Sequence, residues 1–153
     1  MKKILFVMAA AMLMLASVSC KKEDPAPITG TQMITSYYTV KPSQWVTNNN
    51  LDYYYAAFEN ADITKDVVEN GCVQVYYVDS ENRDNPLPYE IFRSIPVTDT
   101  TYAYYSDNFT YDIEESIVTF KFQSSDFNSS ESLNDYGNIV FKVCVFRNAV
   151  LNY

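Results

Sequence analysis

Hydrophobic and polar residues alternate along most of the chain after residue 30, in short runs separated by turn-forming residues. The clearest run extends from Cys72 to Val78 (CVQVYYV), with Gly71 before it and the polar segment DSENRDNP after it. A period of two, rich in β-branched and aromatic residues, predicts a strand with one buried face. Similar runs occupy residues 34–40, 51–58, 92–97, 101–105, 109–113, 116–123 and 138–147.

Seven to nine short strands with no helix between consecutive runs predict antiparallel pairing. We therefore expect an all-β domain, an antiparallel β-sandwich, with a closed barrel as the alternative.

Two segments depart from the alternation. Residues 62–71 predict the one short helix, because Asp62 or Thr64 is suited to cap it and Gly71 to end it in a left-handed conformation. The polar segment 124–137 predicts a packed crossover loop.

The N-terminus has a different pattern. Lys2 and Lys3 precede an apolar segment, residues 4–16, and small residues lead to Cys20. This is the arrangement of a secretory signal, and the apolar segment is shorter than the roughly 20 residues of a membrane-spanning helix. The stretch resembles the lipobox of bacterial lipoproteins, although Ser17 stands where leucine is most usual. The resemblance implies cleavage before Cys20 and acylation of that cysteine; the alternative is an ordinary secretory signal cut elsewhere.

The residues after Cys20 are Lys21, Lys22, Glu23 and Asp24. They resemble the signal that sends lipoproteins of Bacteroidota to the outer face of the outer membrane, which implies display at the cell surface. The alternative is a solvated tether that holds the domain away from the lipid headgroups. The predicted organisation is a signal peptide at 1–19, a lipidated linker at 20–30 and one domain at 31–153.

The charge balance argues against a nucleic-acid partner. Removal of the signal takes away Lys2 and Lys3, which leaves 11 − 2 = 9 basic residues against 19 acidic ones, a formal charge of 9 − 19 = −10. Phosphate binding requires clustered basic residues, and here they are scattered.

The chain has no histidine, which excludes Ser-His-Asp and Cys-His catalysis and histidine-containing zinc sites. We expect neither a catalytic residue nor a metal or cofactor. A hydrolase that uses carboxylates alone stays as an alternative, with Asp112, Glu114 and Glu115 as its acids. Residues 79–85 space oxygen ligands as calcium loops do, but lack the glycine and final glutamate of an EF-hand, so an acidic hairpin loop is the favoured interpretation.

Cys72 and Cys144 form an even pair outside the cytosol, where a disulfide is chemically allowed. Strand phase leaves the pairing open. If Val73 and Val75 face the core, Cys72 lies on the face of Gln74. If Phe141, Val143 and Val145 face the core, Cys144 lies on the face of Lys142. A bridge would require these outer faces to align on neighbouring strands, so two free thiols are the favoured alternative.

The 14 tyrosines occur largely in pairs and triplets, and consecutive strand residues face opposite ways. Outward rings on one sheet would make an aromatic platform for a glycan or a protein. We predict a non-enzymatic binding module with Trp45, Tyr54 and Tyr105 as contacts. Its alternative is a structural or accessory subunit of an outer-membrane assembly.

Two further resemblances concern Bacteroidota. The run ITKDVVENGCVQVYYVD, the later LPY at residues 87–89 and Trp45 upstream resemble a family of surface lipoproteins, which implies a β-sandwich and carries no catalytic residue. Asp99-Thr100-Thr101 resembles an O-glycosylation sequon, which implies a glycan on Thr100.

Overall fold

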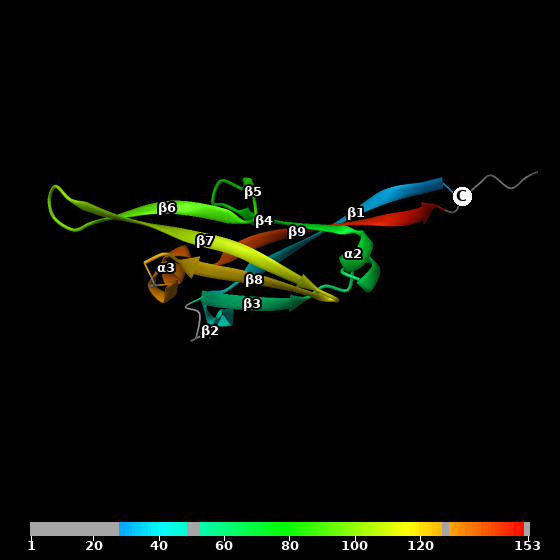
Figure 1. The fold of residues 1–153 in the computed structure, drawn as a ribbon, viewed down its shortest axis with the longest axis horizontal. Helices are drawn as coiled ribbons and strands as arrows, with labels where there is room; N and C mark the ends of the chain where they lie inside the picture. Colours follow the sequence, from blue (N-terminus) through cyan, green and yellow to red (C-terminus); the bar gives the residue numbers. More distant parts are fainter. Residues whose placement is uncertain (1–27, 49–52, 127–128, 152–153) are drawn as a thin grey trace, which may run out of the picture.

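The computed structural model describes residues 28–48, 53–126 and 129–151. Two antiparallel sheets pack into a β-sandwich, which confirms the predicted fold class (Figure 1). The strand order is β1-β9-β4-β5 in the four-stranded sheet and β2-β3-β8-β7-β6 in the five-stranded sheet.

The four-stranded sheet consists of β1 (Ile28–Val40), β9 (Ile139–Leu151), β4 (Cys72–Val78) and β5 (Asp84–Pro86). The five-stranded sheet consists of β2 (Val46–Asn48), β3 (Tyr53–Glu59), β8 (Ile117–Ser124), β7 (Tyr102–Glu114) and β6 (Tyr89–Pro96). Three short helices complete the described chain: η1 (Pro42–Gln44), α2 (Lys65–Asn70) and α3 (Ser129–Tyr136).

An aromatic core joins the two sheets. Phe120 of β8 stacks on Phe141 of β9, with ring centroids 4.2 Å apart. Tyr77 of β4 stacks on Phe109 of β7 at 5.0 Å. Because both pairs cross from one sheet to the other, and because each fully buried phenylalanine contributes roughly 1.5–3 kcal/mol, these contacts fix the sandwich.

Three strands are 13 residues long, and they extend past the sandwich at opposite ends. The β6–β7 hairpin projects beyond α3, and the β1–β9 ribbon projects beyond α2, as Figure 1 shows. Strand β7 unites two runs that the sequence predicts as separate strands, 101–105 and 109–113. Strand β1 begins at Ile28, inside the predicted linker, because residues 28–30 pair with the end of β9.

The predicted helix is present as α2, and Thr64 is its cap, since the Thr64 side chain accepts a hydrogen bond from the Val67 amide at 3.3 Å. The expected left-handed conformation of Gly71 is wrong: its φ is −97°. Glycine is required for space instead. A Cβ atom there would lie 2.7 Å from the Phe146 carbonyl oxygen and 2.8 Å from that of Val67.

The predicted loop at 124–137 contains the helix α3. Its serines and asparagine favour turns in isolation, so propensity gives no helix signal. Tertiary packing stabilises the helix instead, because Ser132 and Leu133 are buried and Tyr136 packs against the core. Gly137 follows the helix with a φ of +64°.

The predicted signal peptide, Cys20 and the segment Lys21–Asp24 lie outside the described residues. Within the described residues, none of the helices has the length and apolar character needed to cross a membrane.

Candidate functional site

Of the predicted contacts, Trp45 lies in the interior, and Tyr54 is half-buried with its side chain on the inward face of β3. Trp45 is 9% exposed, and its ring meets Phe141 edge-on at 6.4 Å. Tyr54 packs against the core because it shares the inward face of β3 with the buried Ala56 and with Phe58.

Tyr105 is half-buried on β7, opposite Arg93 of β6. Cross-strand partners share a face, so Tyr105 lies on the same side of the sheet as Arg93, whose guanidinium reaches the buried Asp107. The structure therefore does not bring the three predicted contacts onto one surface.

The outward tyrosines of β3 are Tyr53 and Tyr55, whose ring centroids lie 6.3 Å apart. The sequence could not separate them from Tyr54, because three consecutive tyrosines hide the strand phase. Phe58 lies four residues after Tyr54 and hence on the same face of the strand, so it is the residue that indicates which tyrosine points inward.

Polar side chains continue this outer face from β3 across β8 to β7. Tyr55 pairs with Lys121, Lys121 with Thr110, and Gln123 with Asn108. With Tyr53 they make the surface that we call the tyrosine face, whose members are Tyr53, Tyr55, Lys121, Gln123, Asn108 and Thr110.

The tyrosine face is hollowed. A cavity of about 150 Å³ is lined by Tyr53, Asn108, Thr110, Lys121, Phe122 and Gln123. The Lys121 ammonium lies 5.6 Å from the centre of the Tyr53 ring and forms an ion pair with Asp112. Asn48 donates a hydrogen bond to the Tyr53 hydroxyl at 3.0 Å, which holds the ring at the rim. The hollow thus offers one aromatic wall together with amide, hydroxyl and ammonium groups.

A second exposed region is the projecting β6–β7 hairpin, which we call the arm (residues 92–105). Phe92 is 80% exposed and Tyr104 is 79% exposed, both on the outer side of the sheet. The exposed apolar residues of the arm are Phe92, Ile95, Val97, Tyr102 and Tyr104. Because neighbouring strand residues face opposite ways, Phe92 and Tyr104 lie on one side of the arm and Ile95 lies on the other.

A buried ion pair fixes the base of the arm. Asp107 is completely buried and accepts hydrogen bonds from the Arg93 Nε at 3.1 Å and the Tyr136 hydroxyl at 2.9 Å. The Arg93 guanidinium also lies over the Tyr136 ring, 4.6 Å from its centre. Burial is the main cause that raises the pKa of Tyr136 above its usual value, and the bond to Asp107 adds to it. The network ties the arm to α3.

Cys72 and Cys144 are free thiols, so the structure contradicts the disulfide. Both lie on the outer face of their sheet, as the strand phase predicted. However, Gln74 stands opposite Cys144, and Cys72 stands opposite Phe146. The sulfurs are therefore offset along neighbouring strands, and Cys144 is buried beside the Thr35 hydroxyl at 3.7 Å.

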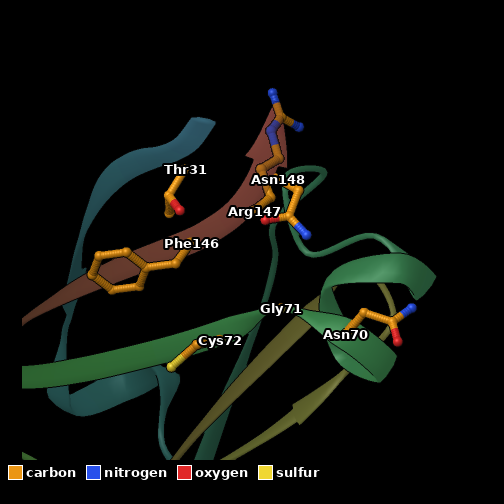
Figure 2. A pocket seen from close by; sticks show the side chains of 7 residues that line it. All are labelled: Thr31, Asn70, Gly71, Cys72, Phe146, Arg147 and Asn148. Carbon is orange, nitrogen blue, oxygen red and sulfur yellow. The ribbon is translucent and has the colours of Figure 1, made fainter. Parts of the chain in front are cut away.

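Cys72 borders a hollow of about 210 Å³ between the end of α2 and β9, drawn in Figure 2. The Arg147 guanidinium points away from the sulfur in this view. Its Nε donates a hydrogen bond to the Gln32 side-chain oxygen at 3.0 Å, and its Nη1 forms an ion pair with the Asp62 carboxylate at 3.9 Å. The residues that line the hollow offer no carboxylate or imidazole to activate the thiol.

The acidic segments have structural partners. Asp79 accepts hydrogen bonds from the Arg83 amide and guanidinium, which lower the pKa of Asp79 to about 2. Asp112 pairs with Lys121, and Glu114 and Glu115 are exposed at the β7–β8 turn. Among the described residues, no group of three or more acids and cysteines is arranged to hold a metal ion.

Thr100 is exposed in the turn at the tip of the arm, where its amide donates to the Thr98 hydroxyl at 3.3 Å. Glycosylation of Thr100 stays a prediction.

No protein-family model, curated protein sequence or solved structure matches the chain.

Proposed function

We propose that the protein is a lipid-anchored, non-enzymatic module of the outer-membrane surface that binds a glycan on the tyrosine face. The observation that carries this proposal is the hollow beside Tyr53, where a flat ring adjoins amides, a hydroxyl and an ammonium group. Aromatic faces cover the apolar faces of sugars, while Asn108, Gln123 and Lys121 suit their hydroxyl groups.

The anchoring part of the proposal rests on the pattern of residues 1–24. The described chain starts at the outer end of the β1–β9 ribbon, and the arm lies at the opposite end of the molecule (Figure 1). An anchor attached before Ile28 would leave the tyrosine face on the side of the domain, accessible to long polymers.

A protein partner is a second candidate, favoured by the arm. Phe92, Ile95 and Val97 bring apolar surface without the neighbouring amides that sugars use. An accessory subunit of a larger assembly would bury this surface against another chain.

The test is binding of the purified lipoprotein to a glycan array, in a detergent without sugar headgroups. Tyr53→Ala removes the aromatic wall and Gln123→Ala removes an amide. For Tyr53→Ala we expect a loss of about 1 kcal/mol, roughly fivefold in affinity.

The matched control is Tyr76→Ala, because Tyr76 is half-buried like Tyr53 and has a lysine ammonium 5.4 Å from its ring centre, but lies on the other sheet. Equal loss in Tyr76→Ala, or no loss in Tyr53→Ala, would refute binding at the tyrosine face. A blank array together with a protein captured by wild type but not by Phe92→Ser would favour the arm.

A further inference from the structure

In the described part of the chain the two sheets have four edge strands, and three of them are protected against pairing with another chain. Strands β2 and β5 are only three residues long, and β5 also contains Asp84 and Pro86. Strand β6 is longer but carries Glu90, Arg93 and Pro96. Short length, charge and proline are the usual devices that prevent edge-to-edge association.

Strand β1 has none of these devices. Its 13 residues, ITGTQMITSYYTV, include no charged residue and no proline. It pairs with β9 along one side, and no other strand of the described chain pairs with its second side. A row of backbone donors and acceptors is therefore presented along the longest edge of the molecule.

The side chains of this edge suit a second copy of the same strand. The outward residues of β1 are uncharged and mainly β-branched or aromatic: Thr31, Met33, Thr35, Tyr37 and Thr39. Such residues form favourable cross-strand pairs. The chain has a net charge of −8, so two copies repel across most surfaces, but β1 against β1 opposes no carboxylates.

We infer that the exposed edge of β1 binds β1 of a second copy. The two copies are related by a two-fold axis, which makes the new strand pair antiparallel and joins two four-stranded sheets into one of eight strands. This dimer is independent of the proposed glycan site, which lies on the other sheet.

The test uses the full chain in detergent, with native mass spectrometry over a range of protein concentrations. Dimers should increase with concentration, and hydrogen exchange of the β1 amides should slow in parallel while that of β6 stays constant. Met33→Lys places like charges at the dimer contact, and we expect its dissociation constant to rise about tenfold.

Val68→Lys is the matched control, because Val68 is similarly exposed (46% against 57% for Met33) but lies on α2. Both variants make the net charge less negative, so a loss confined to Met33→Lys is a local effect at β1. Thr31→Lys serves as the second variant if Met33→Lys does not fold.

A chain that stays monomeric at every concentration with unchanged β1 exchange would overturn the inference. A dimer that forms without protecting β1, or that Met33→Lys and Thr31→Lys leave unchanged, would overturn it as well. The exchange measurement on the wild type requires no variant and decides the question by itself.

Discussion

The arm and the β1–β9 ribbon extend from opposite ends of the same sandwich (Figure 1). The ribbon is made of two 13-residue strands, whereas the arm combines the 13-residue β7 with the 8-residue β6. The arm exposes apolar side chains such as Phe92 and Tyr104, while its edge strand β6 is protected by charge and proline. The β1–β9 ribbon has a threonine-rich edge with no protection of its backbone. The two extensions thus offer a partner different contacts: exposed side chains on the arm and main-chain hydrogen bonds on the ribbon.

The largest expected effect comes from breaking the support of the arm. Arg93→Met leaves the fully buried Asp107 carboxylate without its cation. Loss of one member of a buried ion pair destabilises a protein by about 3–5 kcal/mol. We expect a loss of about 3 kcal/mol here, because the Arg93 side chain is one-third exposed. Urea unfolding would measure the loss. Glu90→Gln, an outward change on the same strand, should cost less than about 0.5 kcal/mol; equal costs would show that the ion pair does not support the arm.

The next effect concerns the other end, where α2 meets the β1–β9 ribbon. Gly71→Ala forces a Cβ atom against the Phe146 carbonyl oxygen, and neither backbone can yield easily. Overpacking of this kind should destabilise the fold by about 2 kcal/mol, measured by thermal or urea unfolding. Val68→Ala on the same helix is the control, with a smaller expected cost. A neutral Gly71→Ala would mean that α2 is not packed tightly on β9.

A smaller effect concerns Tyr136 at the base of the arm, and it appears in how the stability of the protein depends on pH. Burial raises the pKa of Tyr136, so its contribution is fully present below the unfolded value of about 10 and is lost as the pH rises beyond it. Tyr136→Phe should cost about 1 kcal/mol at neutral pH, because a hydrogen bond to Asp107 is lost. Between about pH 9.5 and 11 the variant should lose less stability than the wild type.

Unfolding curves of both proteins at about pH 9.5 and at about pH 11 would measure this difference. Tyr38, Tyr77 and Tyr111 also have raised pKa values, but they are common to both proteins and cancel in the comparison. Identical alkaline sensitivity of the two proteins would contradict the assigned role of Tyr136.

The smallest effect on stability should come from the surface of the arm itself. Phe92→Ser combined with Tyr104→Ser removes exposed rings, so the free energy of unfolding should change by less than about 1 kcal/mol. Binding of a hydrophobic dye should nevertheless fall, since these rings are a large part of the exposed apolar surface. A large destabilisation would show that the two rings stabilise the fold itself, and would contradict their assignment as exposed surface.

Local signals predicted much of the fold. The alternation from Cys72 to Val78 corresponds to β4, and the Thr64 cap begins α2. The sequence also indicated the strand phase that puts Cys72 and Cys144 on the outer face. It could not supply the register that offsets them, because register depends on which residues of two distant strands meet.

The candidate site was less predictable. The sequence predicts a surface of outward tyrosines and names Tyr54 for it, but Tyr54 faces inward and its neighbours Tyr53 and Tyr55 face outward. Trp45, the other predicted contact, lies in the core. An aromatic residue suits the core and a binding face equally well, so only its neighbours in space decide between them.

The sequence by itself determined the all-β class, the capped helix and the absence of histidine chemistry, since each depends on residue type or on short-range spacing. Tertiary structure decided the order of the strands, the helix α3, the spatial requirement at Gly71 and the contrast between the protected β6 edge and the open β1 edge. Those features depend on contacts between residues far apart in the chain, and the free energy of such contacts cannot be inferred from a local sequence pattern.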